Sequence, residues 1–194
     1  WKKYVRLNLP GRFNVANALV AAAIGYGFGM DKEAIVHGLE TCPPVRGRVQ
    51  PVPEAEEFSV WVDYAHTPES LRGVLEAARE MTEGRVIAVF GCGGDRDKGK
   101  RPIMGQVAAG LCELTILTSD NPRTEDPETI LDHIEEGFES AANEADHLRI
   151  ADRREAINEA VARARPGDIV VVAGKGHETY QVNGDHTIHF DDVE

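Results

Sequence analysis

Four short hydrophobic runs recur along the chain and are separated by segments with helical periodicity. The runs are Phe58 to Val62, Val86 to Phe90, Leu114 to Thr118 and Ile169 to Ala173. Because they are nearly continuous rather than alternating with polar residues, they are typical of strands covered on both faces. Strands that alternate with helices predict an α/β fold with a Rossmann-like, mainly parallel sheet.

Other local patterns predict further elements. We expect a short strand at residues 5–9, two helices from Asn14 to Gly27 and from Lys32 to Glu40, and a hairpin around Asn183-Gly184. Capping residues, first-turn prolines and a capping box mark the starts of three later helices, at Thr67-Pro68, at Asp126-Pro127 and at Asp152 with Glu155.

A domain junction is expected before the first long hydrophobic run. The stretch from Cys42 to Arg48 contains prolines and a glycine and lacks helical periodicity, as is common where domains join. We therefore expect two domains, residues 1–48 and residues 49–194.

Each of the four hydrophobic runs is followed by a polar or glycine-rich segment. These segments are Asp63 to Thr67, Gly91 to Lys98, Asp120 to Arg123 and Gly174 to Glu178. The carboxyl ends of parallel strands lie on one edge of a sheet, where open α/β folds bind ligands. Residues far apart in the sequence are therefore expected to converge on one pocket.

The charges in these segments complement a small amino acid. Arg123 could hold a carboxylate through two parallel hydrogen bonds, and Arg96 adds a second cation. Asp120 and Glu178 could accept from an ammonium group. Together the four side chains suit a molecule with two carboxylates and an ammonium. Read alone, Asp-Asn-Pro-Arg is more often an ordinary turn.

Two other patterns are weaker. Gly94 to Lys100 fits G-x-x-x-x-G-K, but Arg101 stands where a phosphate-binding loop needs Ser or Thr to ligate magnesium, and an exposed charged turn is the alternative. His66, Cys92 and His177 share the predicted edge but lack the spacing of a zinc site, so no metal site is predicted. No residue pattern assigns a catalytic nucleophile.

Composition narrows the possible partners. The 194 residues include 33 acidic and 21 basic side chains, a net charge of -12, which disfavours nucleic acid and anionic membranes. No hydrophobic run approaches the ~20 residues that a membrane-spanning helix needs. Three cysteines without a C-x-x-C pair fit a reducing cytoplasm. We expect a cytoplasmic monomer, and the start at Trp1 suggests a part of a longer protein.

Five motifs together resemble the Mur ligases, and among them the MurE type, over essentially the whole chain. In order they are Gly11 to Asn17, Val62 to Pro68, Phe90 to Pro102, Asp120 to Arg123 and Gly174 to Glu178. The resemblance implies that residues 49–194 are a Mur ligase C-terminal domain that binds the incoming amino acid. Residues 1–48 would then be the helical end of the central ATPase domain.

The resemblance also implies an activity that uses ATP and Mg²⁺. Such a ligase converts the D-glutamate carboxylate of UDP-MurNAc-L-Ala-D-Glu into an acyl phosphate, which the amine of the third amino acid attacks. The Asp-Asn-Pro-Arg form implies meso-diaminopimelate, because the lysine-adding members lack the arginine. The phosphate-binding loop and the magnesium ligands are expected to precede Trp1, so the chain alone is expected to be inactive.

Site residues follow from the same resemblance. The positions that hold diaminopimelate match Arg96, Asp120, Asn121, Arg123, Gly174 and Glu178, and the nucleotide positions match Asn14 and Asn17 near adenine and Arg48 and Asp63 at the ribose or phosphates. An alternative is a stand-alone amino-acid-binding or regulatory module derived from a Mur ligase, although such a module would need no nucleotide contacts. A dinucleotide-binding oxidoreductase has little support, since no G-x-G-x-x-G opens a helix after the first strand.

Overall fold

The structure, a computed structural model, describes residues 1–53, 57–141 and 145–194. These residues form two compact units, Trp1–Val45 and Arg46–Glu194. Arg48, at which we expected the domain junction, lies just inside the second unit.

The first unit is a pair of helices, α1 (Arg12–Gly27) and α2 (Lys32–Thr41), as the sequence predicts. Asp31 caps α2, because its carboxylate accepts hydrogen bonds from two amides of the first turn. The prediction of a strand at residues 5–9 is wrong. This segment lies along the end of α2 instead, where Asn8 Nδ2 donates to the Glu40 carbonyl oxygen at 2.7 Å.

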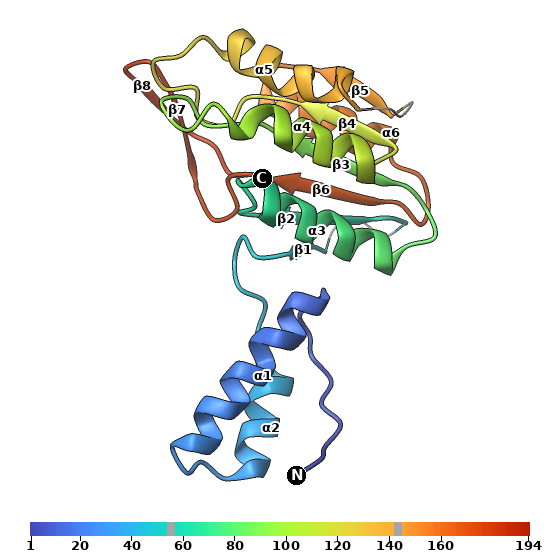
Figure 1. Cartoon of the computed structure of the whole chain (residues 1–194), viewed down its shortest axis with the longest axis vertical. Coiled ribbons are helices and arrows are strands. Elements are labelled where there is room, and N and C mark those ends of the chain that lie inside the picture. The colour runs from blue at the N-terminus through green and yellow to red at the C-terminus, as the bar shows by residue number, and fades with distance from the viewer. Residues whose placement is uncertain (54–56, 142–144) are drawn as a thin grey trace. The chain divides into compact units, whose positions relative to one another are not determined.

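The second unit is built around a six-stranded sheet (Figure 1) with the strand order β1-β2-β6-β3-β4-β5. All neighbours from β2 to β5 are parallel, and β1 is antiparallel to β2. The strands are β1 (Gln50–Val52), β2 (Ser59–Asp63), β3 (Val86–Phe90), β4 (Leu114–Leu117), β5 (Asp146–Arg149) and β6 (Ile169–Ala173). The predicted mainly parallel sheet and its four hydrophobic strands are confirmed.

The predicted helix starts and the hairpin are also present. The helices are α3 (Pro68–Met81), α4 (Lys100–Leu111), α5 (Pro127–Glu139) and α6 (Arg153–Arg163). Thr67 forms a capping box with Ser70, and Asp126 and Asp152 cap α5 and α6 through their carboxylates. An antiparallel hairpin, β7 (Tyr180–Asn183) and β8 (His186–His189), precedes the C-terminal residues.

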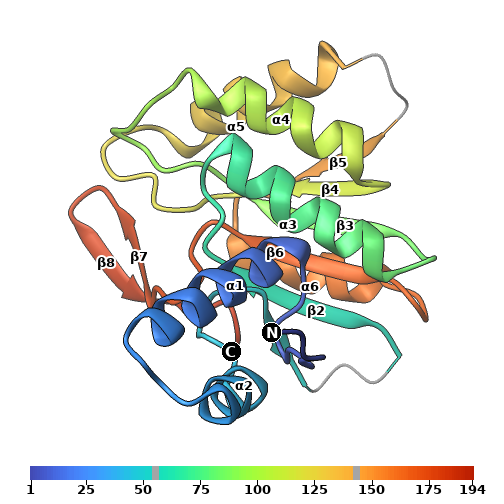
Figure 2. The same cartoon turned by 60° about the horizontal axis from the view of Figure 1, so that its bottom comes forward.

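The sheet is buried because helices cover both of its faces (Figure 2). Alternate side chains of a strand point to opposite faces. Phe90 and Val171 pack with residues of α3, α4 and α5, whereas Val89 and Val172 pack with Ala156 of α6. This two-sided cover explains why the strands read as continuous hydrophobic runs.

The two strands that the sequence did not reveal are the sheet's edges. Edge strand β1 carries Pro51, which is tolerated there because one side of an edge strand needs no ladder hydrogen bond. The other edge, β5, is polar, with Asp146 exposed and His147 half-buried. Among the described residues no helix is long and hydrophobic enough to cross a membrane.

A buried ion pair joins the sheet to the end of the chain. Arg153 Nε and Nη2 each donate to the Asp192 carboxylate at 2.7 Å, and both side chains are 0% exposed. The same guanidinium donates to the Ala173 carbonyl oxygen at 3.0 Å and to the Ser119 carbonyl oxygen at 3.3 Å. Arg153 therefore fixes the chain just after β4 and at the end of β6.

We expect Asp192→Ala to lower the free energy of unfolding by about 3–5 kcal/mol, because it leaves the Arg153 cation buried and unpaired. The matched control is Glu159→Ala, which removes the exposed pair between Glu159 and Arg163 on the same helix. The control should cost at most about 0.5 kcal/mol beyond changes in helix propensity. Urea unfolding measures both, and equal losses would contradict the role of Arg153.

Candidate functional site

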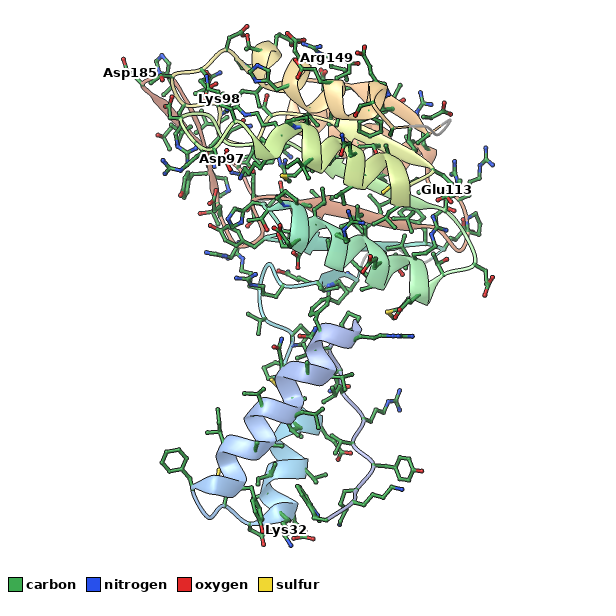
Figure 3. The ribbon with its side chains drawn as sticks, in the orientation of Figure 1. Lys32, Asp97, Lys98, Glu113, Arg149 and Asp185 are labelled. Atoms are coloured by element: carbon green, nitrogen blue, oxygen red, sulfur yellow. The ribbon has the colours of Figure 1, made fainter. Side chains whose placement is uncertain are left out.

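The four polar segments lie at one edge of the sheet, as predicted, because they follow the neighbouring strands β2, β6, β3 and β4. Figure 3 shows Asp97 and Lys98, after β3, at the same end of the sheet as Asp185 in the hairpin turn. Glu113, which precedes β4, lies at the opposite end. This arrangement brings residues separated by more than half the chain into one site.

The centre of the site is a buried polar cluster. Asn121 Nδ2 donates to Glu178 Oε2 at 2.9 Å and to Asp120 Oδ1 at 3.1 Å. Gly174, with a φ of 115°, faces the Asp120 carboxylate, and a Cβ added there would lie 2.6 Å from Oδ2. Only glycine fits this conformation and this approach.

Arg123 is held beside this cluster in an unusual backbone conformation, with a φ of 54°. The hairpin supports it, since Arg123 N donates to the Val182 carbonyl oxygen at 3.1 Å and Gly184 N donates to the Arg123 carbonyl oxygen at 2.6 Å. Arg123 Nη1 donates to the Gly94 carbonyl oxygen at 2.8 Å. Nε and Nη2 have no hydrogen-bond partner in the described parts of the chain, so they are open to a ligand carboxylate.

Arg96 lies at the exposed margin of the site. Its Nη1 donates to the Asp95 carbonyl oxygen at 3.2 Å. Gly93 separates the two arginines, because a Cβ there would lie 2.8 Å from Arg123 Nη1 and 3.7 Å from Arg96 Cγ. The six residues predicted to bind an amino acid are thus brought together.

Sequence analysis missed the buried position of Lys175. Its side chain is 0% exposed, and Nζ contacts Glu178 Oε2 at 3.3 Å and the Tyr180 carbonyl oxygen at 2.5 Å. Glu178 Oε2 is therefore shared between Asn121 and Lys175, while Oε1 has no partner among the described residues. Its place next to a fully hydrophobic strand was the signal that Lys175 could be internal.

Two predicted nucleotide residues lie together at the start of the second unit. The Asp63 carboxylate accepts from Val49 N at 2.7 Å and from Ala65 N at 2.8 Å. Burial raises the pKa of Asp63, and these two backbone hydrogen bonds oppose that rise. Val49 has a φ of 44°, so Asp63 holds a strained backbone in place. The exposed Arg48 guanidinium lies 5.3 Å from the Tyr64 ring centre.

The other two predicted nucleotide residues lie in the first unit, near the start of α1. Asn14 Nδ2 donates to the Pro10 carbonyl oxygen at 2.7 Å, and Asn17 Nδ2 donates to Asn14 Oδ1 at 3.3 Å. The two amides are therefore neighbours on successive turns of one helix.

The described residues offer no ready metal centre. No three His, Cys, Asp or Glu side chains among them gather into a group that could hold a metal ion. Cys92 is buried against Met104, with its Sγ 3.7 Å from Sδ, and burial raises the pKa of the thiol to about 12. The described residues thus offer no set of oxygen ligands that fits Mg²⁺.

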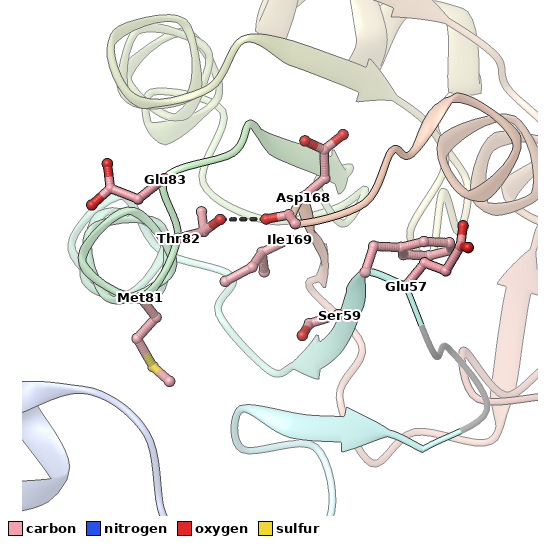
Figure 4. A pocket seen from close by; sticks show the side chains of 9 residues that line it. Glu57, Ser59, Met81, Thr82, Glu83, Asp168 and Ile169 are labelled. Carbon is pink, nitrogen blue, oxygen red and sulfur yellow. Dashed lines mark hydrogen bonds between the residues drawn. The ribbon is translucent and has the colours of Figure 1, made fainter.

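A separate pocket of about 370 Å³ lies at the opposite end of the sheet, where β2 and β6 begin (Figure 4). It is lined by Glu57, Glu83 and Asp168 among others, and Thr82 Oγ1 donates there to the Gly167 carbonyl oxygen. None of the six residues predicted to bind the amino acid lines it. The pocket is therefore not the predicted amino-acid site.

The structure is an α/β domain with side chains of both charges gathered at the carboxyl ends of its parallel strands. The family described as "Mur ligase, glutamate ligase domain" matches residues 47–176, which is most of the chain. The chain belongs to the Mur ligase family.

Individual relatives agree with this assignment. A UDP-N-acetylmuramoyl-L-alanyl-D-glutamate--2,6-diaminopimelate ligase of Clostridium acetobutylicum is 46% identical over 100% of this chain, which spans 40% of that protein. The corresponding ligase of Synechocystis is 51% identical over 96% of the chain and 37% of the relative. The chain thus spans about two fifths of the length of these curated relatives, at their C-terminal part.

Solved structures show the same fold. A structure of a UDP-N-acetylmuramoyl-L-alanyl-D-glutamate--2,6-diaminopimelate ligase aligns with a TM-score of 0.74 and 44% identity, covering 97% of this chain and 38% of that one. The UDP-N-acetylmuramate-alanine ligase of Thermotoga maritima aligns with a TM-score of 0.67 over 90% of this chain and 37% of its own. At 23% identity, the second likeness concerns the fold alone.

Proposed function

We propose that this chain is the C-terminal part of an ATP-dependent ligase that adds meso-diaminopimelate to UDP-MurNAc-L-Ala-D-Glu in peptidoglycan synthesis. The supporting observation is the convergence of two arginines and two acids at one sheet edge, in a chain whose relatives are named diaminopimelate ligases. ATP would convert the D-glutamate carboxylate into an acyl phosphate with release of ADP. An amine of diaminopimelate would then form the amide and release phosphate.

The arginines would bind carboxylates of the amino acid. Arg123 has Nε and Nη2 open, which is the edge of a guanidinium that binds a carboxylate through two parallel hydrogen bonds. Lysine lacks the distal carboxylate and would leave this cation unpaired, which is an energetic basis for rejecting lysine. Arg96, on the other side of Gly93, would supply the second cation.

The acids would bind the amine that does not react. An attacking amine must be neutral, so an ammonium held by Asp120 and Glu178 cannot be the nucleophile, and the two amines are told apart. Lys175 already contacts one oxygen of Glu178. We propose that the ligand ammonium uses Glu178 Oε1 and Asp120 Oδ2, the oxygens that face away from the contacts with Asn121. Asn121 would orient both carboxylates, and Gly174 would leave room for the ligand.

The nucleotide would be shared between this chain and the rest of the enzyme. We propose that Trp1–Val45 is the end of the central ATPase domain, with Asn14 and Asn17 near adenine. Two hydrophobic side chains of α1 are exposed, Leu19 (66%) and Ile24 (56%). Because a helix that is hydrophobic all round is normally buried, their exposure supports the proposal that α1 belongs to a larger domain. Arg48 and Asp63 would contact the ribose or phosphates, and Mg²⁺ would be bound outside the described residues. The whole enzyme would act as a cytoplasmic monomer.

In the whole ligase, Arg123→Ala should lower kcat/KM for diaminopimelate, because it removes a desolvated charge-assisted pair. The expected loss of transition-state stabilisation is about 2–4 kcal/mol. The KM for ATP should stay close to that of the unaltered enzyme. Arg72→Ala, which removes an exposed arginine on α3, serves as the control. Steady-state kinetics with each substrate varied in turn gives the answer, and an unchanged kcat/KM for diaminopimelate would exclude this role.

Glu178→Gln keeps the shape of the side chain but removes one charge from the proposed ammonium site. We expect the KM for diaminopimelate to rise by about tenfold or more while the KM for ATP changes little. Glu136→Gln, an exposed position on α5, is the matched control. If both constants stay at their original values, Glu178 serves only as a partner of Asn121 and Lys175, and the proposed ammonium site is wrong.

We also propose that the 194-residue chain folds but does not catalyse the reaction alone. The sequence segment closest to a phosphate-binding loop ends at Arg101, whose side chain is 0% exposed and so cannot contact a nucleotide. Purified chain should unfold cooperatively on heating yet release no ADP when incubated with ATP, Mg²⁺ and both other substrates. Measurable ADP release would contradict this division of labour, whereas diaminopimelate binding that is independent of nucleotide would favour the stand-alone module.

A further inference from the structure

Arg101, in the first turn of α4, has a completely buried guanidinium. Its Nη2 and Nη1 donate to the two oxygens of Glu125 at 2.9 Å and 3.1 Å. Nη1 also lies 3.0 Å from His133 Nδ1, and Nη2 lies 3.4 Å from the Gly93 carbonyl oxygen. Nε is buried with no partner among the described residues. This ion pair lies beneath the site and outside the residues assigned to the ligand.

Glu125 connects the two loops that carry the arginines. Its carboxylate accepts from Asp95 N at 2.6 Å, in the loop after β3, and its own amide donates to the Pro122 carbonyl oxygen at 3.1 Å, in the loop after β4. Lys98 Nζ also contacts Glu125 Oε2 at 3.0 Å. Hydrogen bonds from Arg101 lower the pKa of Glu125 to about 2, so the carboxylate is charged at neutral pH.

Two strained residues lie next to this pair. Asp95 and Arg123 each have a φ of 54°, and neither is glycine. Such conformations persist only where the surroundings fix them. Glu125 binds the amide of Asp95 directly, and Thr124, which follows Arg123, donates from N and Oγ1 to the Asp95 carboxylate at 3.2 Å and 2.7 Å. Glu125 and Thr124 therefore hold Asp95, and the hydrogen bond from Glu125 N to the Pro122 carbonyl oxygen closes the turn that contains Arg123, in addition to the hairpin contacts of Arg123.

Stability alone does not account for such a pair. A buried ion pair costs so much desolvation that hydrophobic residues of similar size often stabilise a protein equally well. An ion pair differs in direction, because a guanidinium and a carboxylate meet in one planar geometry. Here that geometry determines where the two loops sit relative to each other.

We infer that Arg101 and Glu125 are positioning residues that fix the Arg123 guanidinium, and its separation from Arg96, for the distal carboxylate of the amino acid. They touch no ligand themselves and act through the two loops. The pair sets the discrimination between an amino acid with a distal carboxylate and one without it. This inference rests on the proposed function, since it concerns the same amino-acid site.

The test is Glu125→Gln in the whole ligase, which keeps the shape but turns one acceptor into a donor that faces Arg101. The KM for diaminopimelate should rise about tenfold or more, with the KM for ATP and for the UDP-linked substrate within about twofold of the original. The ratio of kcat/KM for diaminopimelate to that for lysine should fall. Arg101→Lys, which keeps the charge but loses the planar fork, should shift the same constants in the same direction.

The chain offers a matched control at the opposite end of the sheet, just before β3 and β6 begin. Asp168 accepts from Arg85 Nη2 at 2.6 Å and Nε at 3.1 Å and from Arg85 N at 2.9 Å, so it too combines an arginine with a backbone amide. Asp168→Asn should lower the Tm to a similar extent as Glu125→Gln while leaving the diaminopimelate KM and the lysine discrimination unchanged.

The kinetic outcomes distinguish a failure of the positioning role from a failure of the proposed function. If the unaltered ligase uses diaminopimelate and Glu125→Gln lowers only the Tm, as Asp168→Asn does, the positioning role is overturned and the proposed function stands. If the unaltered ligase does not use diaminopimelate, the proposed function fails and this inference fails with it. If Glu125→Gln does not fold, the kinetics of Arg101→Lys decide by the same criterion.

Discussion

The carboxyl edge of the sheet depends on one buried cation, Arg153. Its guanidinium binds the carbonyl oxygens of Ser119 and Ala173 and both oxygens of Asp192, and the side chain is 0% exposed. It therefore fixes the chain after β4 and the end of β6, two strands that lie on either side of β3, together with the start of α6 and the last residues of the chain. A site assembled from loops needs such a fixed base, because a loop can hold a ligand only as accurately as the element that anchors it.

Buried cations also make the acidic half of the site possible. Asp120 and Glu178 both hydrogen-bond to Asn121, so two carboxylates share one small, partly buried space. Like charges at this distance would normally raise a pKa or force the groups apart. Lys175 contacts Glu178 directly, and Arg153 lies near both acids. Among the described residues, each acid keeps one oxygen without a hydrogen-bond partner, Asp120 Oδ2 and Glu178 Oε1.

The sequence was informative where one hydrophobic pattern decided the structure. The runs at Val86 to Phe90 and Ile169 to Ala173 became strands with those bounds, and their order along the chain placed four polar loops on one edge. Edge strands carry no such pattern, so β1 and β5 were missed. The strand expected at residues 5–9 did not form. The burial of Arg101 and Arg153 was also out of reach, and the burial of Lys175 was indicated only by the hydrophobic strand that it follows. Whether a charged side chain is internal depends on partners such as Glu125 and Asp192, which lie 24 and 39 positions away from their arginines.

The proposed site for a charged amino acid is built on strained backbone. Arg123 adopts a left-handed conformation that is unfavourable for a side chain with a Cβ, yet its backbone is bound on both sides, to Val182 and Gly184 of the hairpin. A guanidinium on a relaxed loop could reach many positions, and a carboxylate would then have to order it on binding, which weakens affinity. When the backbone is already held, the entropic cost of ordering the arginine is met when the domain folds and not when the ligand binds. Under the proposed function, selectivity for a distal carboxylate would come from where the charge is held, and a flexible lysine at the same position would carry the charge without the geometry.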